Sequence, residues 1–330
     1  MHPVVGGLSL PSVTLPVQPI TEPDQVMRIS FYGVRGSLPS PGPATAHFGG
    51  NTSCVLVELA DGTLLIFDAG TGLRPLGGRL MASDKPLHLL LTHSHWDHIQ
   101  GFPFFGPIYQ PDREIHICRS LPEGDARFAG VLEQMNGHNH PLAHDTLPSV
   151  LRYMQNPDQF FGLYDFGFRR KELNHPGGGY AYRIDVDGAS FAYVTDNELD
   201  PPQKPATSFG EWVDFCQGVD VLVHDAQYLQ SDMPMKHGWG HSLVSQVREL
   251  AHEANVGCLA LYHHDPERTD HQVLKILDES RGWIAGKGGR TEVLCAFEGL
   301  VIDVARGPGE RTRLEINALR PAAMMAPDQA

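Results

Sequence analysis

The sequence contains few cysteines and few basic residues. Its five cysteines are scattered without a CxxC pair, so we expect no disulfide framework and a reducing, cytoplasmic location. Only 25 Lys and Arg oppose 39 Asp and Glu, which gives a formal net charge of -14. A surface that binds a long nucleic acid needs clustered Lys and Arg. The composition therefore favours a small-molecule substrate and argues against a long nucleic acid as partner.

Long apolar runs are also missing. Prolines at positions 3, 11, 16, 19 and 23 interrupt the first 25 residues, so we expect neither a signal peptide nor a membrane anchor there. We predict an extended lead-in over residues 1–25 and a soluble protein with no membrane partner. The hydrophobic content of 41% over 330 residues still allows a sizeable core.

Short apolar runs separated by turn residues predict many strands. We expect them at residues 27–32, 54–59, 63–67, 87–91, 114–118, 181–186, 190–194, 219–224, 258–262, 292–297 and 300–304. Helical periodicity predicts a helix over residues 242–254. The pattern indicates an α/β domain over residues 26–305, and its hairpins favour two mixed sheets covered by helices. Residues 306–330 are polar and rich in Pro, Ala and Met, which predicts a loose tail.

The most informative segment is THSHWDH, which directly follows the apolar run at residues 89–91. It places His93, His95, Asp97 and His98 within six residues. In an extended loop His93 and His95 project to the same side, and Asp97 and His98 can reach a second ion where the chain turns into a helix. Imidazoles with one carboxylate suit zinc, manganese or iron better than calcium or magnesium. A chance His-rich loop is disfavoured, because charged groups at the end of an apolar strand need a partner.

Further ligand candidates follow later strands or occupy a glycine-rich loop. His175 precedes Pro176 and three glycines, and on its own it could equally be a solvent-exposed loop residue. Asp196 emerges after the strand at residues 190–194, where it could bridge two ions or cap a turn. His263 and His264 both follow the strand at residues 258–262. His263 is favoured because it comes first after the strand, and the choice stays open.

In this order, these residues resemble the ligand set of the metallo-β-lactamase superfamily. Four passages resemble its ribonuclease Z-like phosphodiesterases more specifically: GVRGS at 33–37, FDAGTG at 67–72, VHDA at 223–226 and GHS at 240–242. The resemblance covers roughly residues 27–305. It implies a four-layer αββα sandwich of two mixed β-sheets flanked by helices, with a dinuclear metal site at one edge.

The resemblance also implies roles for individual residues. One divalent ion would be bound by His93, His95 and His175. The other ion would be bound by Asp97, His98 and His263, and Asp196 would lie between the two ions. Zinc is the first expectation for both ions, with manganese or iron as alternatives. Asp97 could also accept a proton. His241 would stabilise the phosphate or protonate the leaving oxygen, with Asp225 orienting it; alternatively, it merely starts a helix. Arg35 could contact phosphate or hold the turn at Gly36, and His264 could hydrogen-bond a ligand.

Two departures from the family narrow the substrate. Asp196 follows His175 by only 196 - 175 = 21 positions, so the long basic arm of tRNA-processing members is absent. This favours small phosphodiesters such as cyclic nucleotides or cyclic sugar phosphates. The second departure is an enlarged stretch between His98 and His175, which contains Phe102, Phe105 and Phe161 and includes an insertion around residues 120–165. Aromatic residues in this enlarged region could stack a base over the metals, or form a lid or a homodimer contact. Three of its histidines, at 138, 140 and 144, lie in a Gly/Asn/Pro setting that favours a solvated loop over a third metal site.

The function predicted from these features is hydrolysis of a small phosphodiester by a hydroxide that two metal ions generate. A lactone, β-lactam or thioester hydrolase of the same fold is an alternative, because a fold alone does not define a substrate. A non-catalytic metal-binding sensor or scaffold is an alternative of another class.

Overall fold

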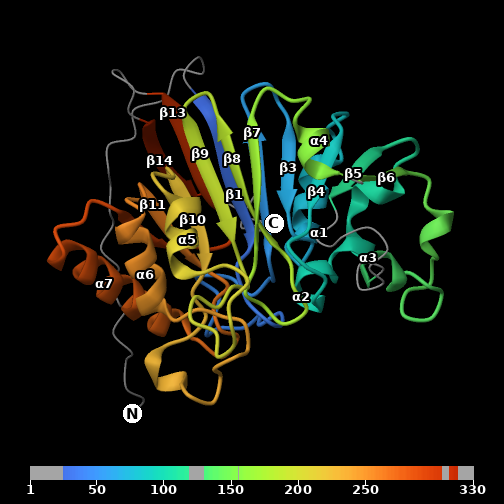
Figure 1. The fold of residues 1–330 in the computed structure, drawn as a ribbon. Coiled ribbons are helices and arrows are strands. Elements are labelled where there is room, and N and C mark those ends of the chain that lie inside the picture. Colours follow the sequence, from blue (N-terminus) through green and yellow to red (C-terminus); the bar gives the residue numbers. More distant parts are fainter. Residues whose placement is uncertain (1–24, 119–129, 155, 307–311, 319–330) are drawn as a thin grey trace, which may run out of the picture.

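Two β-sheets pack face to face in the middle of the molecule (Figure 1). The computed structural model describes residues 25–118, 130–154, 156–306 and 312–318, so the predicted lead-in, except residue 25, lies outside the described residues. The larger sheet contains, in spatial order, β14 (Thr312–Ala318), β13 (Leu300–Arg306), β1 (Gln25–Gly33), β2 (Cys54–Leu59), β3 (Leu64–Phe67), β4 (Leu87–Leu90), β5 (Glu114–Cys118) and β6 (Val150–Met154). The smaller sheet contains β12 (Glu292–Cys295), β11 (Cys258–Tyr262), β10 (Val221–Asp225), β9 (Ala189–Val194), β8 (Tyr180–Val186) and β7 (Gly167–Glu172).

The space between the sheets is filled by one hydrophobic cluster with residues from both of them. In β2, Val55 and Val57 join this cluster, while Cys54 and Leu56 face the opposite side and join another. Side chains alternate between the faces of a strand, so a strand buried on both faces is apolar at nearly every position. This explains why the predicted strands appear as continuous apolar runs.

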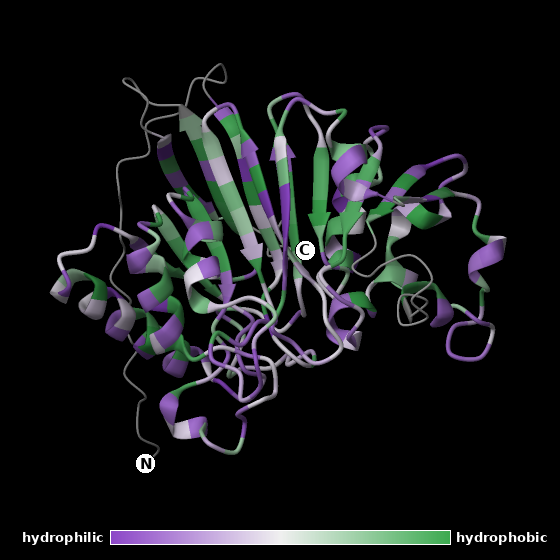
Figure 2. Ribbon diagram, in the orientation of Figure 1, coloured by the Kyte–Doolittle hydropathy of each residue, from purple (hydrophilic) through white to green (hydrophobic). Residues whose placement is uncertain are grey.

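Helices cover the outer faces of both sheets. The smaller sheet is covered by α5 (Phe209–Cys216), α6 (Val244–Glu253) and α7 (Asp270–Gly286), whose Trp212, Val247 and Ile284 belong to one hydrophobic cluster. On the larger sheet lies α1 (Leu73–Leu80), with the short helices α2 (Trp96–Ile99) and α3 (Gly130–Glu133) beyond it (Figure 1). The short helix α4 (Pro157–Phe161) instead packs against β7 and adds Phe161 to the cluster between the sheets. Apolar residues concentrate in the strands (Figure 2). The predicted four-layer αββα sandwich is confirmed.

The carboxyl ends of the central strands define one edge of the sandwich. Strands β3, β4 and β5 run parallel, and so do β9, β10 and β11. In parallel strands the carboxyl ends meet at the same edge, where ligands commonly bind. The long loops gather below the sheets at this edge (Figure 1). The THSHWDH segment, Asp196, Asp225 and His263 all lie at or just past such strand ends.

The predicted loose tail is wrong for the segment that forms β14. This strand pairs antiparallel with β13 over the whole range from Leu300 opposite Ala318 to Arg306 opposite Thr312. Leu314 and Ile316 pack against the core cluster, while Arg313, Glu315 and Asn317, which alternate with them, are polar. A single short alternating run between polar segments gave too weak a signal for a strand.

The insertion around residues 120–165 extends the larger sheet, because β6 pairs in parallel with β5. Phe102, Phe105 and Phe161 are almost fully buried, so the hypothesis that such aromatics stack a base over the metals is wrong for these three. Residues 119–129 and 155 lie outside the described part of the chain. No helix within the described ranges is long and apolar enough to cross a bilayer.

The inter-sheet core provides a test of the fold. Phe67 is fully buried, and its ring centroid lies 5.2 Å from that of Phe191 and 5.3 Å from that of Tyr193. We expect Phe67→Ala to lower the free energy of unfolding by about 3–5 kcal/mol, because it removes buried area and leaves a cavity. Leu163→Ala, at a side chain that is 84% exposed, is the control and should change it by less than about 0.5 kcal/mol. Urea unfolding measures the free energy of unfolding of both variants. Equal losses for Phe67→Ala and Leu163→Ala would contradict the packing described.

Candidate metal centre

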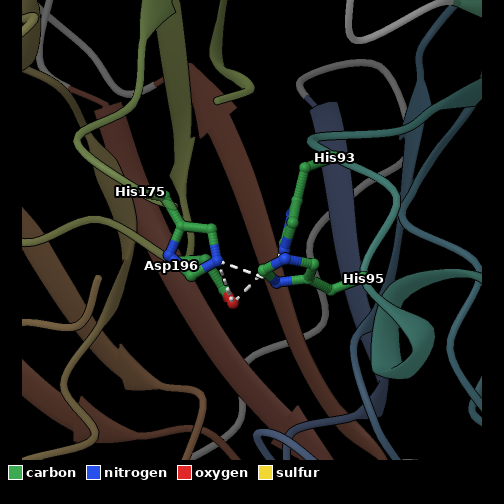
Figure 3. A group of neighbouring side chains, drawn as sticks. All are labelled: His93, His95, His175 and Asp196. Atoms are coloured by element: carbon green, nitrogen blue, oxygen red, sulfur yellow. Dashed lines mark hydrogen bonds and ion pairs between the residues drawn. The ribbon is translucent and has the colours of Figure 1, made fainter. Parts of the chain in front are cut away.

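Seven side chains converge at the carboxyl edge as two overlapping groups of potential metal ligands, and a third possible group adds Asp225 and His241 to Asp196 and His263. The first group contains His93, His95, His175 and Asp196, and the second contains Asp97, His98, Asp196 and His263. Figure 3 shows the first group, in which residues from both sheets point toward one another. All four residues of the second group are buried, whereas His95 of the first is exposed. The centre is therefore accessible from the His95 side.

Asp196 is shared by both groups through different oxygen atoms. Its Oδ2 lies 3.5 Å from His93 Nε2 and 3.7 Å from His175 Nε2. Its Oδ1 lies 3.1 Å from His98 Nε2 and 3.1 Å from His263 Nε2. A carboxylate with one oxygen directed at each set of imidazoles has the geometry of a bridge between two cations.

In three of the ligand histidines, Nδ1 is the outer nitrogen, which points away from the centre, and it lies within hydrogen-bond distance of an acceptor. Nδ1 of His98 lies 2.8 Å from a carboxylate oxygen of Asp68. Nδ1 of His263 lies 2.8 Å from Gln227 Oε1, and Nδ1 of His175 lies 2.9 Å from the carbonyl oxygen of Gly240. Because each outer nitrogen donates its proton, each Nε2 presents a lone pair to the centre. Such partners commonly fix the tautomer and orientation of metal-binding histidines.

The inward-facing atoms fit cations, and hydrogen bonds within the protein satisfy them only in part. His98 Nε2 and His263 Nε2 face each other at 3.3 Å, although both present lone pairs. His93 Nε2 is buried without a hydrogen-bond partner. Buried lone pairs and carboxylates at this density are unfavourable unless positive charge lies between them. The donor set of imidazoles and two carboxylates suits divalent transition metals.

The electrostatic field at the centre also favours a cation. Burial lowers the pKa of His98, but the carboxylates of Asp196, Asp97 and Asp68 outweigh burial and raise it well above its ordinary value. For Asp196, burial raises the pKa, and the imidazoles around it, His263 and His98 first, reverse the shift and lower it strongly. The same field that retains a proton on an imidazole would stabilise a metal ion in its place.

Backbone strain is concentrated at this site. Asp68, Asp196 and His263 have φ angles of 59°, 55° and 58°, in the left-handed region that residues with a Cβ rarely adopt. Strain of this kind persists where the surrounding structure holds it, often at functional sites. Gly240 has a φ of 87°, and a Cβ there would lie 2.1 Å from His175 Nδ1, so only glycine allows its carbonyl to approach the imidazole.

His241 and Asp225 form a hydrogen-bonded pair beside the second group. His241 Nδ1 lies 2.8 Å from Asp225 Oδ2, and its ring stacks on that of His263 with centroids 5.1 Å apart. Burial lowers the pKa of His241, but the charge and hydrogen bond of Asp225 outweigh it and raise the pKa to about 9. Because Nδ1 is held by the carboxylate, Nε2 is the nitrogen left for a substrate.

The structure places His264 outside both ligand groups. Its Nε2 lies 2.8 Å from the carbonyl oxygen of Ala296, to which the neutral ring donates, and burial keeps its pKa at about 3. Its backbone carbonyl accepts from Gly36 and its amide donates to Val34. His264 thus secures the loop after β1, and its predicted contact with a ligand is wrong.

Arg35 is also removed from any substrate. Its side chain is fully buried and donates to the carbonyl oxygens of Gly49 at 2.8 Å, Asp265 at 3.1 Å and Arg268 at 2.8 Å. The predicted phosphate contact is wrong for a side chain buried in this way, and its hydrogen bonds give it a structural role at these loops instead. The guanidinium fixes the loops behind the centre.

Several functional residues were missed by the sequence reasoning. Asp68, Gln227, Glu198 and the amide of Ser37, which donates to Asp97 Oδ2 at 2.7 Å, all support ligands or the loops that carry them. Asp68 had a signal, since it follows β3 within the FDAGTG passage. Gln227 and Glu198 had none, because only the tertiary fold brings them to the histidines and loops they hold.

Comparisons with known proteins agree with this geometry. A model of the beta-lactamase superfamily domain matches residues 63–264. Ribonuclease Z from Thermoplasma acidophilum is 25% identical over 77% of this chain and 91% of its own length. Among solved structures, the metallo-beta-lactamase fold protein YhfI from Bacillus subtilis aligns with a TM-score of 0.60 and 20% identity, over 84% of this chain and 99% of that one. A diphosphatase from the PhnP family aligns with a TM-score of 0.57 and 17% identity, over 83% and 96% of the two chains.

The fold and the ligand groups together define a metal-dependent hydrolase of the metallo-β-lactamase type. The chain belongs to the beta-lactamase superfamily, and its relatives place it in the ribonuclease Z-like branch. The resemblance inferred from the sequence is confirmed for both the family and the branch.

Asp68 offers a test of the outer partners. We expect Asp68→Asn to weaken binding of one metal ion by about 10–100-fold, because the partner that fixes the tautomer of His98 is lost. Asp112→Asn is the matched control, since Asp112 also has a positive φ, of 57°, and is exposed in a loop. Metal affinities are measured by competition with a chelator. Equal affinities for Asp68→Asn and the control would contradict this role.

Proposed function

We propose that the protein is a dinuclear phosphodiesterase that hydrolyses a small phosphodiester, such as a cyclic nucleotide or a cyclic sugar phosphate. The observation that carries this proposal is the Asp225–His241 pair beside the shared carboxylate of Asp196. It puts a proton donor next to two cation sites, as a phosphodiester with a poor leaving group requires. Relatives named ribonuclease Z support a phosphodiester as the reacting group.

The first ion would be held by His93, His95 and His175, and the second by Asp97, His98 and His263, with Asp196 between them. Two divalent ions, which we propose to be zinc, would lower the pKa of a coordinated water and offset charge on the phosphate. Manganese or iron would accept the same ligands.

The chain's own residues then move the protons. Hydrolysis adds water across a P–O bond, so the water oxygen joins phosphorus and the leaving oxygen needs a proton. Asp97 can accept the proton that water loses, and His241 Nε2 can deliver one to the leaving oxygen. Asp225 holds the ring of His241 in the orientation that this transfer needs.

Three substrates test the proposal on metal-loaded protein: bis-p-nitrophenyl phosphate, 3′,5′-cyclic AMP and a lactone. We expect turnover of the two phosphodiesters. We expect His95→Ala to lower this activity by at least about 100-fold, because removing a metal ligand should cost more activity than removing a residue that hydrogen-bonds a ligand. His140→Ala, at a histidine packed edge-on against Phe104 outside both ligand groups, is the matched control and should keep full activity.

The outcomes separate the alternatives. Turnover of the lactone alone would reject the phosphodiesterase in favour of the other hydrolase of this fold. If metal binds and none of the substrates reacts, a non-catalytic sensor or scaffold is the better account.

A further inference from the structure

The loop after β1 contacts the second ligand group through Ser37. The backbone amide of Ser37 donates to Asp97 Oδ2 at 2.7 Å. The same carboxylate oxygen lies 3.3 Å from His98 Nε2 and 3.2 Å from His263 Nε2, so it is the oxygen of Asp97 that faces the second cation site. Ser37 is therefore separated from this cation site by a single carboxylate oxygen.

Gly36 allows the loop to come this close. A Cβ at Gly36 would lie 2.5 Å from His263 Nδ1 and 2.7 Å from Gln227 Oε1, so a side chain at this position would displace both groups. The next residue, Ser37, is exposed, whereas all four ligands of the second group are buried. Ser37 is therefore in contact with both the buried ligand group and the solvent from which a substrate arrives.

The backbone of Ser37 is strained. Its φ angle is 62°, in the left-handed region that residues with a Cβ rarely adopt. Glycine would take this conformation at a lower cost. Strain of this kind is often found at functional sites, where the surrounding contacts maintain it. A serine at this position therefore indicates a role for the serine side chain itself.

The Ser37 hydroxyl is held in place and still has a proton to donate. Gln227 Nε2 donates to Ser37 Oγ at 3.2 Å, while Oε1 of the same side chain accepts from His263 Nδ1. Gln227 thus fixes the hydroxyl relative to a proposed metal ligand. A hydroxyl that accepts one hydrogen bond keeps its own proton for another acceptor. Among the residues that the structure describes, none accepts this proton.

The acceptor that fits this donor is an anionic oxygen at the second cation site. A phosphodiester carries its negative charge on two nonbridging oxygens, and an oxygen at this site would lie beside Asp97. The carboxylates of Asp97 and Asp196 repel such an oxygen, and a neutral donor adds attraction without displacing a cation. Hydrogen bonds to an ionised acceptor are stronger than neutral ones, and fixed donors aimed at developing charge lower the barrier of a reaction.

We propose that Ser37 is a substrate-contacting residue, whose hydroxyl donates to a nonbridging phosphate oxygen at the second cation site. This inference rests on the proposed phosphodiesterase function for its substrate. It gives the GVRGS segment a phosphate-binding role through Ser37, while Arg35 of the same segment points into the protein and fixes the loops.

The test uses metal-loaded protein and two measurements, binding of inorganic phosphate by isothermal titration calorimetry and turnover of bis-p-nitrophenyl phosphate. We expect Ser37→Ala to weaken phosphate binding and to lower kcat/KM by about 10–100-fold, the range for a hydrogen bond to a charged group. The affinity for each metal ion should change by less than about threefold, because the Ser37 amide still donates to Asp97.

Two further variants separate the hydroxyl from the backbone. Ser37→Gly should lose as much phosphate affinity as Ser37→Ala, although glycine adopts the positive φ more readily. Ser37→Asn should lose less than either, because asparagine tolerates this φ and its side-chain amide is a donor. Ser40→Ala is the matched control, since it removes a hydroxyl that donates to the carbonyl of Leu38 in the same loop. This control should behave as the unaltered protein.

The outcomes distinguish this contact from a structural role. Unchanged phosphate affinity in Ser37→Ala would overturn the proposal. A smaller loss in Ser37→Gly than in Ser37→Ala would assign the effect to backbone strain, and an equal loss of metal affinity would assign it to Asp97; either result also overturns the proposal. If Ser37→Ala weakens phosphate binding but the unaltered protein turns over no phosphodiester, the phosphate contact is supported and the proposed function is rejected.

Discussion

Five imidazoles and two carboxylates meet at the carboxyl edge of the sandwich, and their inward-facing lone pairs can be compensated only by positive charge. Asp68, Gln227 and the carbonyl of Gly240 take the outer protons of three histidines and thereby direct the Nε2 lone pairs at Asp196. This arrangement costs free energy without cations, since buried charge and unpaired polar atoms are unfavourable. It becomes stabilising when cations bind, so folding and metal binding are expected to be coupled.

The sandwich provides the rigidity that such a site needs. Each sheet delivers its ligands from the ends of parallel strands, and the tightly packed space between the sheets fixes the distance from the first sheet's His93 to the second sheet's Asp196. The strained backbone at Asp196 and His263 is tolerated for the same reason. Asp225, at the end of β10, uses this frame to hold His241 next to the ligands.

Much of the architecture could be predicted from the sequence, because strands buried on both faces leave continuous apolar runs. The edge strands β6, β7 and β14 escaped prediction, since they are partly exposed and mix polar with apolar residues. The helix α7 was missed although Thr269 and Gln272 form a capping box at its start. The ligand motif was recognisable because its residues are close in sequence. The supporting roles of Glu198 and Gln227 depend on long-range contacts that no local sequence pattern records. The same is true of the finding that His264 and Arg35 contact neither the metal ligands nor a substrate.

The central claim is that Asp196 lies between two cation sites. The most direct measurement is anomalous diffraction from crystals of the metal-loaded protein, recorded at the absorption edge of the bound element. The account predicts two peaks about 3.5–4 Å apart, one among His93, His95 and His175 and the other among Asp97, His98 and His263, with an oxygen of Asp196 facing each. A single peak, or peaks that leave Asp196 unbound, would contradict it.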